Sequence, residues 1–191
     1  IMLPEIVRSV TAHDAPLKIE RTAANSIDAL CRGASDGLTL TLNVIAMLIA
    51  FVAVVALANY LLGLMLRPFS VQMTWQTLLG WVNAPLAWLM GVPAKDCLRV
   101  GEILGERIVL NEFFGYLTLT RQKASLDERS FVLATYALCG FANFSSIAIQ
   151  IGGIGGLAPE RRSDLAQLGL RSMIGGMLAC YLTAAIVGIL I

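Results

Sequence analysis

The chain has 191 residues, of which 57% are hydrophobic and 14% charged, with a formal net charge of +1 and a mean hydropathy of +0.75. Soluble domains are about a quarter charged, and here the charges gather in short connections between long apolar runs. This pattern predicts an all-α integral membrane protein, and the near-neutral charge without a basic patch argues against a nucleic acid partner.

Residues 1–37 are mixed in composition, and prolines with scattered charges predict a polar connector. Within this segment, apolar residues recur at helical spacing from Lys18 to Arg32, which predicts an amphipathic helix lying at the membrane surface. The chain begins with isoleucine and shows no signal peptide. We therefore expect that it is a portion of a longer protein.

Four apolar stretches are predicted to cross the membrane, and three of them have no polar interruption of the kind described below for 129–158. Residues 38–66 carry no formal charge over more than the roughly 20 residues that a spanning helix needs. Residues 74–92 contain three tryptophans and Pro85, which is expected to kink this second span. The last span covers 163–191, where small residues recur every fourth position and favour close helix packing.

Residues 93–122 differ from these spans because neither half is long or apolar enough to cross alone. Apolar residues stand beside charges, and two short amphipathic pieces meet near Leu110 and Asn111. We predict a re-entrant hairpin, which is tolerated at membrane depth where it is buried in protein or lines a wet cavity. In its first half the apolar residues stand beside charges at Arg99, Glu102, Glu106 and Arg107.

Residues 129–158 form an apolar run whose middle is polar. Asn143, Ser145 and Ser146 stand between glycines inside this run, and a purely structural span has no need of such side chains. We predict a broken transmembrane helix that holds a polar solute. In this interpretation Ser145 caps the half-helix that follows the break.

Glu112 is the strongest single candidate for a binding residue. A carboxylate at membrane depth is unfavourable by several kcal/mol, about 3 on insertion scales, and marks a functional site by default. If Asn111 begins the second arm of the hairpin, Glu112 lies in its first turn, where the helix dipole favours negative charge. Its role would be to accept hydrogen bonds from hydroxyl groups; the alternative is a hairpin tip exposed at the surface.

Asn143 and Ser146 are three residues apart and would share one face of a continuous helix. An amide and a hydroxyl together offer donors and acceptors suited to a neutral ligand rich in hydroxyl groups. The alternative is hydrogen bonding between helices. Phe141 is a candidate for stacking on a ring, with ordinary packing as its alternative.

The residue types argue against an enzyme. The sequence has no nucleophile–base pair, no metal cluster and no phosphate-binding loop, so we predict no catalytic residue, metal or prosthetic cofactor. Residues 153–158 match GxGxxA formally, but no soluble strand precedes them, so we reject a dinucleotide site. The four cysteines lack CxxC spacing and are interpreted as buried small side chains.

Several motifs together resemble the concentrative nucleoside transporters. They are Leu138–Ile147 (LCGFANFSSI), Gly152-Gly153, Ala158–Asp164 (APERRSD), Asn111-Glu112-Phe113 with Tyr116, and Pro85-Leu86-Ala87 with Met90–Pro93 (MGVP). Family members commonly have valine and alanine where Phe114 and Gly115 stand, which is a mild departure. The matches are spread from about Asn25 to the C-terminus.

This resemblance implies the fold. By this resemblance the chain would contain the fifth helix (38–66), the sixth helix (74–92), the second re-entrant hairpin (93–122), the unwound seventh helix (129–158) and the eighth helix (163–191). The chain would contain mainly the second half of an inverted-repeat transporter. The family's first hairpin, which reads the base and contributes to the cation site, has no matching residues here.

The resemblance also implies roles and partners. Glu112, Asn143 and Ser146 would bind ribose hydroxyls, and Phe141 would lie beside the nucleoside. The coupling cation would be sodium or a proton, held by ligands outside this chain, and the residues present fit either one. They likewise fit a nucleoside with a purine or a pyrimidine base. The protein would be a homotrimer in a plasma membrane, namely a bacterial inner membrane, with several spans, the sixth helix in its scaffold and an extracytoplasmic C-terminus.

We therefore predict part of an ion-coupled symporter that imports nucleosides such as uridine by alternating access. The basic residues are distributed so that the positive-inside rule gives no orientation. Two alternatives belong to other classes: a non-transporting membrane interaction subunit, and a channel, which would need a continuous polar stripe along a span.

Overall fold

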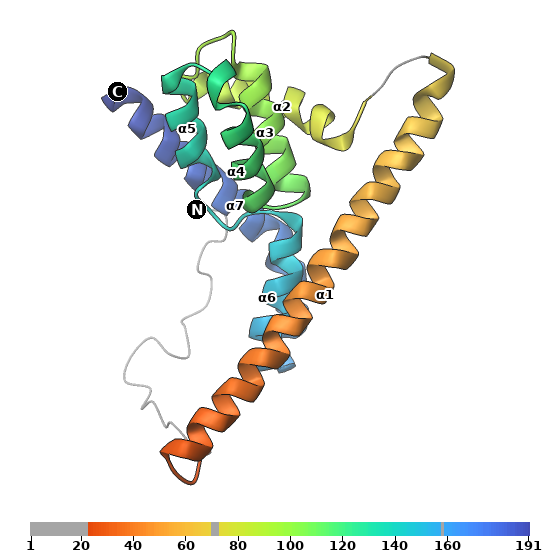
Figure 1. The fold of residues 1–191 in the computed structure, drawn as a ribbon, viewed down its shortest axis with the longest axis vertical. Helices are drawn as coiled ribbons and strands as arrows, with labels where there is room; N and C mark the ends of the chain where they lie inside the picture. Colours follow the sequence, from red (N-terminus) through yellow and green to blue (C-terminus); the bar gives the residue numbers. More distant parts are fainter. Residues whose placement is uncertain (1–22, 70–72, 158) are drawn as a thin grey trace. The chain divides into compact units, whose positions relative to one another are not determined.

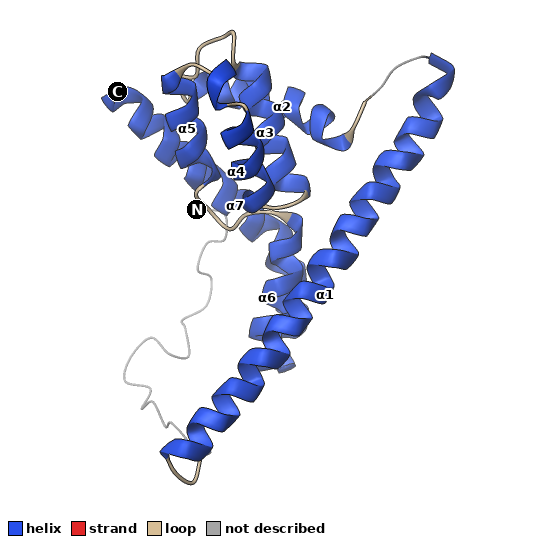
Figure 2. Cartoon of the chain, viewed as in Figure 1, coloured by secondary structure: helices blue, strands red, loops and turns tan. Residues whose placement is uncertain are grey.

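The computed structural model describes residues 23–69, 73–157 and 159–191 (Figure 1). Within these ranges the chain contains helices and no strand (Figure 2), so the predicted all-helical class is confirmed. The chain divides into two units, Ile1–Ile45 and Ala46–Ile191. The motifs on which the predicted site depends all lie in the second unit.

Helix α1 (Ser26–Leu66) has 41 residues, a length of about 61 Å at 1.5 Å per residue. It runs through Gly33 and Gly37, so no break separates the described part of the expected surface helix from the expected span at 38–66. No proline interrupts this stretch, and glycine is tolerated in a helix. The remainder of the expected surface helix, 18–22, lies outside the described residues, as do residues 1–17 of the expected connector.

Helix α2 (Trp75–Leu89) is capped by Thr74, whose side chain accepts a hydrogen bond from the Thr77 amide. It ends before Gly91, which has φ +92°. The Gly91 amide bonds Trp88 O at 2.9 Å and the Val92 amide bonds Ala87 O at 3.1 Å, the two bonds of a Schellman motif. Pro85 lies inside the helix. At 15 residues, α2 is shorter than the expected span 74–92.

Helices α3 (Cys97–Val109) and α4 (Glu112–Arg121) occupy the range predicted for the hairpin. They are about 20 Å and 15 Å long, so neither can cross a hydrocarbon core of about 30 Å. Asn111 caps α4, its side chain accepting from the Phe114 amide at 3.2 Å. This cap places Glu112 at the first position of the helix.

The predicted broken helix consists of α5 (Glu128–Leu138) and α6 (Phe144–Leu157). Helix α7 (Arg162–Leu190) follows and packs against both. Side chains of α2, α3, α4, α5 and α7 form an apolar core. Its fully buried members include Val100, Ile103, Leu104, Leu133, Ala134 and Leu138.

Two of the described helices, Ser26–Leu66 and Arg162–Leu190, are long and apolar enough to cross a membrane. In the sequence, 74–92 was also expected to cross. The structure gives that region 15 helical residues, which is about 22 Å and shorter than a hydrocarbon core.

A polar network joins the start of the hairpin to the start of α5. The Asp96 carboxylate accepts from the Ser130 hydroxyl at 2.6 Å and from the Asp127 amide at 2.9 Å. Burial alone would raise the pKa of Asp96, but these two hydrogen bonds and the charges of Lys95 and Arg99 lower it below its usual value. The network therefore holds an ionised carboxylate that is only 2% exposed.

Candidate functional site

The break between α5 and α6 brings three polar side chains together. Asn143 immediately precedes α6, and its Oδ1 accepts from the Ser146 amide at 2.7 Å. In return, the backbone amide of Asn143 donates to Ser146 Oγ at 3.1 Å. These reciprocal bonds cap the first turn of α6.

Ser145 does not cap the half-helix, contrary to the expectation from the sequence. The helix already begins at Phe144, so Ser145 lies within its first turn and Asn143 is the cap. The Ser145 hydroxyl lies 2.7 Å from Asn143 Oδ1 and 3.3 Å from Leu110 O. It thereby links the cap to the tip of the hairpin.

Glu112 reaches the same place from the hairpin. Asn143 Nδ2 donates to Glu112 Oε2 at 2.7 Å, which is the short distance of a charge-assisted hydrogen bond. Asn143 is fully buried and Ser146 is 2% exposed, whereas Glu112 is half-buried. The structure thus brings Glu112, Asn143 and Ser146 into one hydrogen-bonded cluster.

The resemblance implies that Glu112 and Asn143 bind the same ribose, and in the structure the two side chains bond directly to each other. A ligand hydroxyl can reach the cluster by exchanging with that bond, because a hydroxyl both donates and accepts and can satisfy the carboxylate and the amide.

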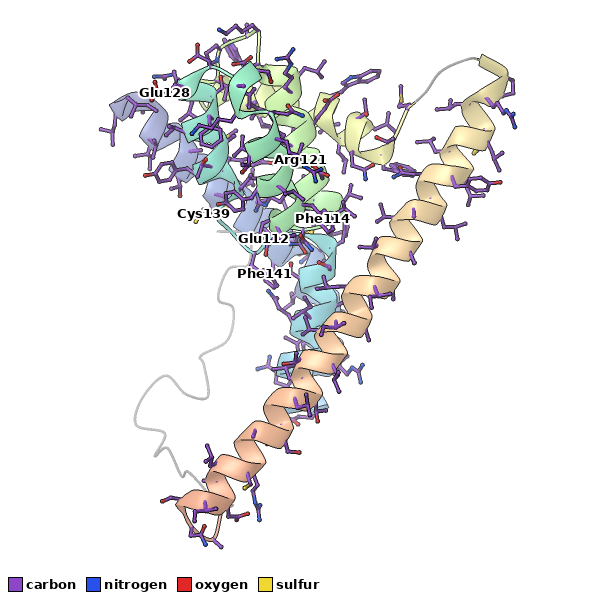
Figure 3. All side chains as sticks on the ribbon, viewed as in Figure 1. Glu112, Phe114, Arg121, Glu128, Cys139 and Phe141 are labelled. Atoms are coloured by element: carbon purple, nitrogen blue, oxygen red, sulfur yellow. The ribbon has the colours of Figure 1, made fainter. Side chains whose placement is uncertain are left out.

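Phe141 belongs to the break itself and is 52% exposed. It stands two residues before Asn143 and is labelled with Glu112 in Figure 3. An aromatic ring that only filled the core would be covered by neighbouring side chains. Its exposure leaves a face available for a planar ligand.

Arg107 is a residue whose environment was misjudged from the sequence. It was grouped with the polar charges of α3, yet its side chain is 0% exposed. A helical repeat could have revealed this, since Arg107 falls seven residues after Val100 and three after Leu104, on the buried stripe. Its contacts are with Ala137 O at 2.9 Å and Gly140 O at 3.3 Å.

Comparison with known sequences identifies the family. A family model described as "Na+ dependent nucleoside transporter C-terminus" matches residues 1–188. The chain belongs to the concentrative nucleoside transporter family. The predicted resemblance is confirmed. Members of this family are transporters and not enzymes, and they are membrane proteins.

Curated relatives of this transporter chain include proteins from bacteria and animals. It is 44% identical over 193 residues to the uncharacterized transporter YutK of Bacillus subtilis, covering 100% of this chain and 48% of that protein. It is 39% identical over 189 residues to nucleoside permease NupC of Helicobacter pylori, covering 96% and 45%. It is 38% identical over 207 residues to sodium/nucleoside cotransporter 1 of Rattus norvegicus, covering 100% and 32%. The chain therefore spans less than half the length of these relatives.

Solved structures agree with the sequence relatives. A variant of CNTnw in the intermediate 2 state has a TM-score of 0.82 and 38% identity, covering 88% of this chain and 43% of that one. CNTnw in an inward-facing substrate-bound state has a TM-score of 0.72 and 34% identity, covering 93% and 44%. The helical fold of this chain is thus that of the matching part of solved family members.

Proposed function

We propose that the protein containing this chain is an ion-coupled symporter that imports nucleosides by alternating access. In this proposal the chain contributes the half-site that binds the ribose hydroxyls through Glu112, Asn143 and Ser146, with Phe141 beside the nucleoside. The coupling cation is sodium or a proton and is transported with the substrate. The relatives named as sodium/nucleoside cotransporter and nucleoside permease support this assignment.

The observation that carries the proposal is the hydrogen bond between Asn143 Nδ2 and Glu112 Oε2 at 2.7 Å. It joins the tip of a hairpin to the break of a helix, two places where helices are interrupted. Interrupted helices of this kind form the substrate sites of many secondary transporters. A carboxylate acceptor beside an amide matches the donors and acceptors of a vicinal diol.

The same contacts support a mechanism. Because Glu112 and Ser145 tie the hairpin to the broken helix, the two elements can move together as one body against the remaining helices. Alternating access by such a body exposes a central site to each side in turn. A cation gradient drives import if the cation binds the loaded state more strongly than the empty one.

The proposed location is a plasma membrane, a bacterial inner membrane, which the protein crosses several times as a homotrimer. One face of α2 carries exposed apolar side chains, while α3 covers the other. Trp81, Val82, Trp88 and Leu89 are between 53% and 66% exposed. An apolar face of this kind fits lipid or a second copy of the protein, as a scaffold helix requires.

The test is uptake of radiolabelled uridine by the full-length protein in proteoliposomes. We expect uridine to accumulate above its outside concentration when a sodium or proton gradient is imposed, and the gradient that supports accumulation identifies the cation. Uptake that only equilibrates uridine would favour a channel. Absence of uptake for every nucleoside tested would favour a non-transporting interaction subunit.

A further inference from the structure

Arg107 is a buried cation that the proposed half-site does not use. It lies on the apolar stripe of α3 with Val100, Ile103 and Leu104, and its side chain has no exposed surface. A buried charge is strongly unfavourable unless partners compensate it. Among the described residues, the ion pairs do not include Arg107. Its compensation must therefore come from neutral groups.

Those groups are the backbone carbonyls at the end of α5. Arg107 Nη1 donates to Ala137 O at 2.9 Å, and Nη2 donates to Gly140 O at 3.3 Å. Nη2 also lies 3.7 Å from Cys180 Sγ on α7. The last carbonyls of a helix lack intrahelical partners and carry the negative end of its dipole, so a cation is favourable there.

The guanidinium fixes the geometry of the break because it bonds both sides of the point where α5 ends. Ala137 belongs to the last turn of the helix, and Gly140 lies beyond it. The Gly140 carbonyl also accepts from the Ala142 amide at 2.9 Å, so Arg107 holds a short turn of backbone in place. A side chain at Gly140 would collide with Cys180 Sγ, so the absence of a side chain there allows this turn to lie close to α7.

The hairpin consequently holds the break from two directions. Arg107 on α3 holds the chain before Asn143, while Glu112 on α4 bonds the Asn143 side chain itself. If the hydrogen bonds of Arg107 are lost, the backbone between Leu138 and Asn143 gains conformational freedom. The side-chain amide of Asn143 is then no longer held toward Glu112. The planar, multi-donor guanidinium is suited to this task, whereas a lysine ammonium would span fewer partners.

We propose that Arg107 is a positioning residue of the nucleoside site, acting through the backbone of the break and without touching the substrate. The expected change in the KM for nucleoside rests on the proposed function. A residue that only stabilised the fold would lower the amount of folded protein and leave the KM for nucleoside unchanged.

The kinetic test compares Arg107→Gln and Arg107→Lys in the full-length transporter, with Arg99→Gln as the matched control. Arg99 is on the same helix, is exposed, and donates to Ser125 O at 2.9 Å. We expect Arg107→Gln to raise the KM for uridine about tenfold, since a hydrogen bond to a charged group is lost. Arg107→Lys should give a smaller rise, and Arg99→Gln none. Unchanged KM in both Arg107 variants would overturn the inference.

A second measurement does not depend on transport. Hydrogen exchange of the purified full-length protein should be faster at Gly140 and Ala142 in Arg107→Gln than in the wild type, with α2 and α3 unchanged. If the wild type transports no nucleoside, the proposed function fails, yet this exchange pattern still tests the role of Arg107. Equal exchange at the break in the wild type and both variants would contradict it, and Arg107→Lys serves if the glutamine variant does not fold.

Discussion

The hairpin formed by α3 and α4 contacts its two neighbours in different ways, through backbone on one side and through side chains on the other. Toward α2, Gly101 and Gly105 bring backbones together, so that a Cβ at Gly101 would lie 2.5 Å from Gly80 O. Toward the break, the contact is made by side chains, chiefly Asn143 with Glu112. Backbone packing tolerates little change, whereas a side-chain hydrogen bond can be exchanged for a bond to a ligand. In this structure the hairpin therefore has a close backbone contact with α2 and a polar contact with the break that a ligand can replace.

The largest expected effect is on the glycine contact. Gly101→Leu forces a large side chain against the backbone of α2, and overpacking costs about 1–3 kcal/mol or more. We expect a clear fall in the thermal unfolding midpoint of the full-length protein in detergent. Gly63→Ala is the control, because nothing lies within 4 Å of that position, and it should leave the midpoint unchanged or slightly higher. Equal effects of the two substitutions would show that the α2–α3 contact is not tight.

Asn143→Asp separates the two tasks of that residue. The aspartate keeps an oxygen that can cap α6, but it replaces the donor toward Glu112 with a second carboxylate. Uridine uptake at neutral pH should therefore fall at least about tenfold, while the unfolding midpoint changes less than in Asn143→Ala. Adding Glu112→Gln restores a hydrogen-bond donor at this contact and should recover part of the uridine uptake. No recovery in the double variant would argue against the direct bond.

Asp96→Asn tests the polar network outside the site. The lowered pKa of Asp96 means that its carboxylate stabilises the folded protein above its unfolded pKa of about 3.9, and this contribution is lost as pH falls through the lower folded pKa. We expect Asp96→Asn to destabilise by about 1–3 kcal/mol at pH 7. The difference in the free energy of unfolding between the variant and the wild type should narrow below about pH 4. A difference that stays constant from pH 7 to pH 3 would show that the charge is not responsible.

Phe141→Ala should have the smallest effect on stability. The ring is 52% exposed, and substitutions at exposed positions usually change stability by less than about 0.5 kcal/mol. If the ring contacts the nucleoside, the KM for uridine should still rise several-fold. Phe113→Ala, at 67% exposure on α4, is the matched control. A similar KM for both variants and the wild type would remove Phe141 from the proposed site.

The helical class and the family were predictable from the sequence, because apolar runs and the motif around Asn143 are local features. The burial of Arg107 was missed although the helical repeat with Val100 and Leu104 indicates it. Its partners could not be predicted, since the carbonyls that receive the guanidinium are placed by the end of α5. The same reason explains Ser145: which polar residue caps a helix depends on where the backbone leaves the break. The direct bond between Glu112 and Asn143 is a tertiary contact and has no local signature.

The most direct test of the account is the KM for uridine of the full-length protein carrying Glu112→Gln. Glutamine keeps the size of the side chain but removes the charged acceptor of the Asn143 bond. We predict a KM at least about tenfold higher than in the wild type, with a folded protein of similar unfolding midpoint. Unchanged KM and unchanged uptake would contradict the assignment of Glu112 to the nucleoside site.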